Sequence, residues 1–254
     1  MVVEFEKQGN LAMITLNRPE ARNAVNGEVA SSMEAILDDY ESDPDLWAAI
    51  LMANGSVFCA GADLKEIAAG RGHQLGTAKG GFAGLVKRAR TKPLIAAIRG
   101  SALAGGTEIA LSCDMIVCAE DTQFGLPETK RSLVAAAGGL FRLPRAIGMA
   151  PALEAIMTGD PIPAERAYQL GMVNYMVPEA EVVATAKSLA ERVTAAAPLA
   201  VQHSRSVAIQ AFTEEDETLW QASFKAFSEN AKTEDYQEGP RAFIEKRSPL
   251  WKGK

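Results

Sequence analysis

The sequence predicts an α/β protein with a helical C-terminal region, and two observations lead to this fold class. Short apolar runs alternate with helical patterns through the first half of the chain, which is typical of stacked α/β units with mainly parallel strands. From about Pro144 the pattern becomes helical. We therefore expect an α/β core over residues 1–195 and a helical region over residues 196–254.

Each element follows from its own local pattern. Runs rich in apolar residues predict strands at Val2–Lys7, Leu11–Leu16, Ala48–Met52, Leu94–Ile98 and Met115–Cys118. Helical spacing of apolar residues predicts helices at Asn26–Glu41, Gly81–Arg90 and Gly106–Cys113. Residues 69–81 are rich in glycine, which predicts a mobile loop.

The second half of the chain carries proline at several helix starts, where proline loses no hydrogen bond because the first N–H groups of a helix are unpaired. The expected helices are Met149–Met157, Ala164–Leu170, Glu179–Ala196, Pro198–Phe212, Glu214–Asn230 and Thr233–Lys246.

The composition is that of a soluble globular protein, with 48% hydrophobic and 23% charged residues in a chain of 254. The net charge is −6 and there is no basic block, which argues against nucleic acid or an anionic membrane as the main partner. The least polar stretch, Pro93–Cys113, contains Arg99, Glu108 and several glycines. We interpret this stretch as buried core and expect no membrane span.

Cysteine and histidine give no sign of a metal site. Cys59, Cys113 and Cys118 form no CxxC pair, and His73 and His203 lie far apart in the sequence. The N-terminus has no secretory or transit pattern. We therefore expect a cytoplasmic protein with reduced cysteines and no bound metal.

Two segments of small residues each lead into a helix start: Cys59–Glu66, which contains Gly61, and Ala104–Glu108, which contains Gly105. Glycine allows the backbone to approach another group closely, and helix N-termini offer unpaired N–H groups. Two such N–H groups could hold a carbonyl oxygen as it becomes an enolate. The alternative is that both segments are simple helix starts packed tightly on strands.

Two carboxylates follow these segments. Glu108 lies within an otherwise apolar helix start, and Glu128 follows an apolar turn 20 residues later. Burial of an unpaired carboxylate raises its pKa, which suits acid–base chemistry on one water. The alternatives are that Glu108 is a satisfied buried acid or a helix cap, and that Glu128 is a surface carboxylate paired with Arg131. Lys65 is a candidate cation for a phosphate, or else a solvated helix-surface lysine.

Other site classes lack their motifs. No GxxxxGK[ST] occurs, Gly105-Gly106 and Gly138-Gly139 do not form a GxGxxG after a strand, and no serine has a GxSxG context.

Five motifs occur in an order that resembles the crotonase (enoyl-CoA hydratase/isomerase) superfamily. They are Leu16–Pro19, Phe58–Glu66, Ala104–Ala110, Phe124–Glu128 and Ala167–Val173, and the match continues to residues 242–247. The resemblance implies a crotonase-like spiral of ββα turns with a helical C-terminal region that drives trimerisation. It also implies a homotrimer or a homohexamer built as a dimer of trimers.

The resemblance further implies an acyl-CoA substrate, whose thioester oxygen would lie between the amides of Ala62 and Gly105. The carboxylate matching Glu108 would activate a water for attack at C3, and the one matching Glu128 would deliver a proton to C2. No cofactor is implied, because coenzyme A is part of the substrate. The residues implied in substrate binding are Ala21, Arg22, Ala60, Gly61, Asp63, Leu64, Lys65, Gly106, Phe243 and Lys252, the last two through the C-terminal region and across a subunit interface.

The sequence departs from the family pattern after Glu128. Short-chain hydratases tend to carry glycine and proline before the double glycine, whereas Ser132–Gly139 contains three consecutive alanines. The acyl pocket wall is therefore expected to differ. The presence of both carboxylates favours an enoyl-CoA hydratase, with carnitinyl-CoA-type dehydration or enoyl-CoA isomerisation as alternatives, and a non-catalytic acyl-CoA-binding or RNA-binding protein as a further one.

Overall fold

The computed structural model describes residues 1–254 and is built on a six-stranded sheet. In spatial order its strands are β1 (Val3–Gln8), β2 (Leu11–Leu16), β3 (Ala48–Ala53), β7 (Leu94–Ile98), β9 (Met115–Ala119) and β12 (Tyr175–Val177). β1 pairs with β2 in antiparallel fashion and all the other neighbours are parallel. The mainly parallel pairing confirms the α/β prediction.

A second, four-stranded sheet turns the chain into a spiral. Its order is β11 (Ile162–Pro163), β10 (Gln123–Gly125), β8 (Ser101–Leu103) and β4 (Val57–Cys59). Each of β4, β8 and β10 directly follows a strand of the large sheet and precedes a helix. The helices are α2 (Leu64–Ala68), α3 (Gly105–Ser112) and, after a 3-10 turn at Pro127–Arg131, α4 (Gly139–Ile147). The repeated ββα turns are therefore those of the predicted spiral.

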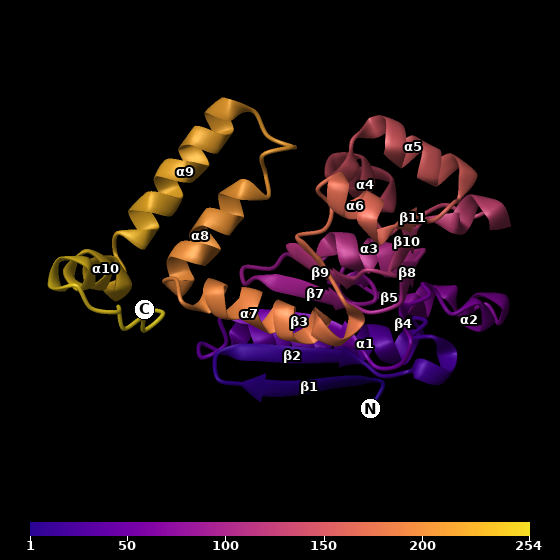
Figure 1. The fold of residues 1–254 in the computed structure, drawn as a ribbon, viewed down its shortest axis with the longest axis horizontal. Coiled ribbons are helices and arrows are strands. Elements are labelled where there is room, and N and C mark those ends of the chain that lie inside the picture. The colour runs from indigo at the N-terminus through magenta and orange to yellow at the C-terminus, as the bar shows by residue number, and fades with distance from the viewer.

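The remaining helices are α1 (Gly27–Ser42), α5 (Met149–Thr158), α6 (Ala164–Gln169), α7 (Val182–Thr194), α8 (Pro198–Ala208), α9 (Asp216–Asn230) and α10 (Glu234–Glu245). The helices α8, α9 and α10 lie at one end of the molecule and α2 lies at the other (Figure 1). No helix combines the length and the apolar composition that a membrane span requires.

The core explains why the central strands read as continuous apolar runs. All six residues of β2 are buried, because alternate side chains enter two separate clusters. Ile14 and Leu16 join the larger cluster with α1 and α3, whereas Leu11 and Met13 join a smaller one that α7 covers. A strand buried on both faces has no alternating polar residues.

The expectation of a helix over residues 81–90 was wrong. Residues 81–90 form no helix but a short strand, β6 (Gly81–Phe82), followed by turns. Gly84 has φ +66° and passes so close to α1 that a Cβ would lie 2.2 Å from the Ala30 carbonyl oxygen, a contact that no periodicity reveals. Residues 69–81 are not an open loop, since they include a 3-10 turn at Gly72–Leu75 and β5 (Gly76–Thr77), which pairs with β6.

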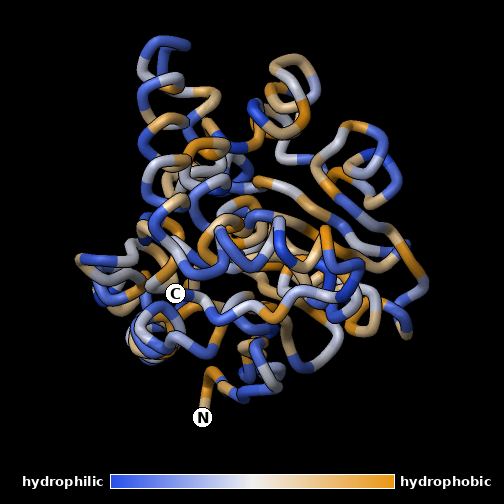
Figure 2. The backbone as a smooth tube through the Cα atoms, turned by 90° about the vertical axis from the view of Figure 1, so that its left-hand side faces the viewer, coloured by the Kyte–Doolittle hydropathy of each residue, from blue (hydrophilic) through white to orange (hydrophobic).

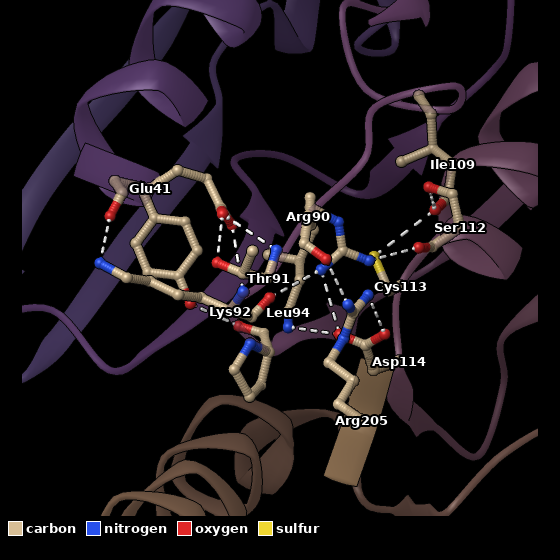
Figure 3. Close-up of polar contacts among 12 residues, drawn as sticks. Glu41, Arg90, Thr91, Lys92, Leu94, Ile109, Ser112, Cys113, Asp114 and Arg205 are labelled. Atoms are coloured by element: carbon tan, nitrogen blue, oxygen red, sulfur yellow. Dashed lines mark hydrogen bonds and ion pairs between the residues drawn. The ribbon is translucent and has the colours of Figure 1, made fainter. Parts of the chain in front are cut away.

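The C-terminal helices are attached to the core by buried charges. Arg205 of α8, Arg90 and Asp114 point toward one another (Figure 3). Asp114 lies 3.0 Å from Arg90 Nη1 and 2.8 Å from Arg205 Nη2, and it also accepts the Leu94 N–H at 2.8 Å. These contacts fix where α8 leaves the core and therefore where α9 and α10 project.

Candidate active site

The predicted site residues gather around one large cavity of about 1470 Å³. It lies among the loop after β4, the start of α3, the 3-10 turn after β10 and the β5–β6 hairpin. Of the residues predicted from the sequence, the cavity is lined by Ala21, Arg22, Ala60, Ala62, Asp63, Leu64, Lys65, Gly105, Glu108 and Glu128. Segments more than 100 residues apart in the sequence therefore share one surface.

The two small-residue segments touch at Gly61. This residue has φ +92°, and a Cβ placed there would lie 2.8 Å from the Ala104 Cβ and 2.9 Å from the Gly105 nitrogen. Only glycine combines that backbone conformation with so close an approach. The packing brings the amides of Ala62 and Gly105 to the same part of the cavity wall.

Both of these amides are unpaired. In the parallel bridge between Val25 and Ala62, the Val25 N–H donates to the Gly61 carbonyl at 2.8 Å and the Asp63 N–H donates to the Val25 carbonyl at 2.9 Å. The Ala62 N–H therefore points away from Val25 and donates no hydrogen bond within the chain. Gly105 is the first residue of α3, so its N–H has no partner in the helix. The two donors are free to bind an oxygen.

The turn before α3 is held in a strained conformation. Ala104 has φ +53° and ψ −126°, which a residue with a Cβ rarely adopts. Its N–H donates to the Gly125 carbonyl at 2.8 Å, and Thr107 Oγ1 lies 2.6 Å from the Ala102 carbonyl oxygen and accepts the Gly125 N–H at 2.9 Å. These bonds tie the start of α3 to the end of β10 and offset the strain.

Glu108 is a buried carboxylate on α3. Its Oε1 accepts the Gly139 N–H at 2.8 Å, at the N-terminus of α4. Burial raises the pKa of Glu108 from its usual value near 4.5 to about 7, and the nearby charge of Glu128 adds to the rise. The Gly139 and Ala137 amides and the charge of Arg142 act in the opposite direction. A carboxyl with this pKa can accept or donate a proton near neutral pH.

Glu128 lies on the 3-10 turn and is half-buried. Its Oε2 is shielded from solvent and has no hydrogen-bond partner, and burial raises its pKa. No ion pair forms with Arg131, so the alternative of a paired surface carboxylate was wrong. The two carboxylates differ in environment while they share one cavity, which is a requirement for one acid and one base.

The pKa of Glu108 gives a prediction for stability. Between pH 4.5 and about 7 the folded state binds more protons than the unfolded state, so stability falls as pH rises through this window. Glu108→Gln is neutral at every pH and is expected to be more stable than the wild type at pH 8, by about 3 kcal/mol. The difference should vanish below pH 4.5. Urea unfolding at several pH values measures it, with the exposed Glu154→Gln as the control for loss of one negative charge.

Comparison with known proteins agrees with the fold. The family model for enoyl-CoA hydratase/isomerase matches residues 6–254. The chain belongs to the enoyl-CoA hydratase/isomerase family.

Relatives within this family carry two kinds of name. The crystal structure of an enoyl-CoA hydratase from Mycobacterium tuberculosis H37Rv is 42% identical, with a TM-score of 0.96 over 100% of this chain and 99% of that chain. That of a carnitinyl-CoA hydratase from Mycobacterium avium is 44% identical, with a TM-score of 0.79 over 100% and 99%. A carnitinyl-CoA dehydratase from Salmonella typhi is 38% identical over 258 residues, which cover 99% of this chain and 98% of the relative.

Four residues predicted for substrate binding do not line the cavity of this enoyl-CoA hydratase/isomerase family member. Gly61 acts through its contact with Gly105, and Gly106 lies against β4, where a Cβ would be 2.1 Å from the Cys59 carbonyl oxygen. Phe243 is 84% exposed on α10, and Lys252 pairs with Glu234 at 2.8 Å. The helix α10 and the C-terminus lie at the end of the molecule opposite α2 (Figure 1).

Sequence reasoning missed Gly139 and Phe82. Gly138-Gly139 was considered as a nucleotide loop and as part of the family pattern after Glu128, although a double glycine before an amphipathic helix also predicts a free helix N-terminus that could receive a carboxylate. Phe82 lines the cavity beside Gly105, where a Cβ would lie 2.4 Å from its ring. No sequence signal pointed to Phe82, since it belongs to a segment that was predicted to be helical.

Proposed function

We propose that the protein catalyses the reversible addition of water across the 2,3 double bond of a 2-enoyl-CoA thioester. The observation that carries the proposal is that two unpaired N–H groups and two unlike carboxylates, Glu108 and Glu128, line the same cavity. An isomerase moves only one proton between two carbons, so a single carboxylate would serve it. Two carboxylates suit the addition of water, which needs a base and an acid.

The reaction follows from these positions. The thioester oxygen accepts hydrogen bonds from the N–H groups of Ala62 and Gly105, which polarises the conjugated double bond toward C3. Glu108 takes a proton from water as the water oxygen bonds to C3, and negative charge moves onto the thioester oxygen. Glu128 then gives a proton to C2 as the enolate collapses. The reverse sequence dehydrates a 3-hydroxyacyl-CoA.

The other end of the cavity suits coenzyme A. Arg22 and Lys65 line it, as does Arg18, whose guanidinium lies 3.3 Å from the Asp63 carboxylate. Cations of this kind neutralise phosphates. Ala21, Ala60 and Leu64 add small and apolar surface beside them. The proposal requires no metal or separate cofactor, because coenzyme A enters with the substrate.

Dehydration of carnitinyl-CoA is the second candidate, and the names of the Salmonella typhi and Mycobacterium avium relatives favour it. Its acyl group carries a quaternary ammonium, which proteins bind with aromatic faces. Phe82 is the sole Phe, Tyr or Trp residue lining the cavity, and the wall beside the two carboxylates consists of Leu133, Val134, Ala136 and Ala137. This lining supports an uncharged acyl group.

We also propose that the working form is a homotrimer or a dimer of trimers, assembled through α9 and α10. No residue of α9 is buried, and exposed aromatic side chains on it include Trp220, Phe224 and Phe227. The side of the molecule that faces the viewer in Figure 2 is the end that carries these helices, and its backbone shows both hydrophobic and hydrophilic residues. Apolar surface of this extent favours contact with further copies of the chain. A neighbouring copy could then bring Phe243 and Lys252 to the coenzyme A, and sedimentation of the full chain tests the assembly.

The deciding experiment follows the absorbance of the conjugated enoyl thioester. Crotonyl-CoA, a medium-chain and a bulky branched 2-enoyl-CoA would be supplied in one direction, and carnitinyl-CoA in the other. Loss of absorbance with an enoyl-CoA supports hydration. Appearance of absorbance with carnitinyl-CoA alone would transfer the proposal to the second candidate, and no change with any substrate, while coenzyme A still binds, would refute both.

A further inference from the structure

Arg142 is a half-buried arginine beside the proposed site, and it has no carboxylate partner. It lies on α4, less than one turn after Gly139, whose N–H binds Glu108. Its Nη2 donates to the Val86 carbonyl at 2.6 Å, and its Nη1 donates to the Ala137 carbonyl at 3.3 Å. Val86 and Ala137 both line the cavity. One guanidinium therefore joins two wall segments that are 51 residues apart in the sequence.

The backbone leaves space for this side chain. Gly138 has φ +109°, and a Cβ there would lie 2.2 Å from Arg142 Nη1. The guanidinium can fold back over the start of α4 because this position is glycine. Arg145, on the same helix, lies with its guanidinium carbon 5.2 Å from the centre of the Phe141 ring. Its side chain is exposed and makes no hydrogen bond or ion pair. The two arginines thus have the same charge and different connections.

The charge of Arg142 acts on Glu108. Burial lowers the pKa of Arg142, and the charges of Arg90 and Arg145 add to that decrease, whereas the Glu108 charge and, less strongly, Cys113 oppose it. An arginine remains protonated under these conditions. The charged groups that act on Glu108 are Glu128, which disfavours its ionised form, and Arg142, which favours it.

We propose that Arg142 is a positioning residue that fixes the two wall segments of the acyl pocket and keeps the charge of Glu108 available to activate water. This proposal rests on the proposed hydration of a 2-enoyl-CoA. The role of Arg142 also affects substrate specificity. Its two hydrogen bonds, to Val86 and Ala137, hold the wall of the acyl pocket and limit the width of that pocket. Loss of the tie should admit bulkier acyl groups.

The first test measures the charge effect without turnover. The stability gained by Glu108→Gln is followed from pH 4 to 9 in the wild type and in the Arg142→Gln and Arg145→Gln backgrounds. Arg142→Gln should move the midpoint of that gain to higher pH, because the cation that favours ionised Glu108 is gone. Arg145→Gln should leave it near the wild-type value. Equal midpoints in the two backgrounds would overturn the charge role.

The second test measures the width of the pocket by binding of saturated butanoyl-CoA and a branched, bulkier acyl-CoA. In the wild type we expect tighter binding of the smaller ligand, and in Arg142→Gln a loss of about tenfold in that preference. Arg142→Lys keeps the charge but can reach only one carbonyl. Arg142→Lys should therefore return the midpoint of the stability gain to its wild-type pH, whereas the preference for butanoyl-CoA over the bulkier acyl-CoA should remain reduced.

These outcomes separate the two proposals. If the wild type hydrates no enoyl-CoA, the proposed function fails, while the titration and the binding preference still decide the role of Arg142. If the wild type is active and Arg142→Gln matches Arg145→Gln in both tests, Arg142 is a structural residue only and the inference is overturned.

Discussion

Glu108→Gln is expected to lower the rate of enoyl-CoA hydration by 100-fold to 10,000-fold, which is about the contribution of a positioned general base. The glutamine amide oxygen can still accept the Gly139 N–H that now binds Glu108 at 2.8 Å. The side chain would therefore keep its place but could not remove a proton from water. Steady-state kinetics with a 2-enoyl-CoA measures the loss in kcat.

Binding measurements separate this effect from damage to the fold. Coenzyme A should bind Glu108→Gln as it binds the wild type, because the cations Arg18, Arg22 and Lys65 lie on other segments of the cavity. Glu128→Gln should lose activity on a similar scale through loss of the proton donor to C2. Near-normal hydration by either variant would show that the role given to that residue is wrong.

The pH dependence of the wild type should reflect both carboxyls. Hydration needs Glu108 ionised and Glu128 protonated, so the rate should pass through a maximum. Its limbs belong to the coupled pair rather than to single residues. Burial raises the pKa of both carboxyls, that of Glu108 to about 7, so the maximum should lie at a higher pH than for two ordinary glutamates.

The parts of the fold that the sequence predicted well are those with a pattern long enough to show. The strands Leu11–Leu16 and Leu94–Ile98 were predicted to the residue, because both lie inside the large sheet and, apart from Thr15, are apolar. β4, β8 and β10 were missed because a strand of three residues has no period. The helix expected over residues 81–90 failed because Gly84 packs on Ala30, a contact between distant segments.

The same distinction applies to the site. Glu108 was conspicuous because a carboxylate in an apolar helix requires an explanation, and the structure buries it as expected. Its partners at Gly139, Ala137 and Arg142 were not predicted, because they are determined by how α4 packs against α3. The helix α4 itself was not predicted: the helical pattern was expected from about Pro144, with Met149–Met157 as its first helix, whereas α4 begins at Gly139 and contains that proline. The sequence therefore predicted which residues could carry acid–base chemistry, but it did not predict the tertiary contacts that shift their pKa values.

Gly61→Ala is expected to lower kcat by about 100-fold to 1,000-fold, the effect of losing a donor to the thioester oxygen. The added methyl would lie 2.9 Å from the Gly105 nitrogen and 2.8 Å from the Ala104 Cβ, so the two segments that supply the N–H groups must separate. Neither carboxylate is altered by this change. The acid–base groups would remain in place while the thioester oxygen loses its hydrogen bonds.

Gly171→Ala is the matched control for the backbone. Gly171 has φ +86°, close to the +92° of Gly61, but nothing lies within 4 Å of a Cβ placed there. Both variants should lose about 1–2 kcal/mol of stability, because alanine disfavours the left-handed conformation. Thermal unfolding should show this loss in both variants and a further loss in Gly61→Ala from the contacts with Ala104 and Gly105, whereas only Gly61→Ala should lose turnover. Equal activities would mean that the contact between Gly61 and Gly105 does not position the amides. A loss confined to Gly61→Ala would assign the thioester oxygen to the Ala62–Gly105 pair.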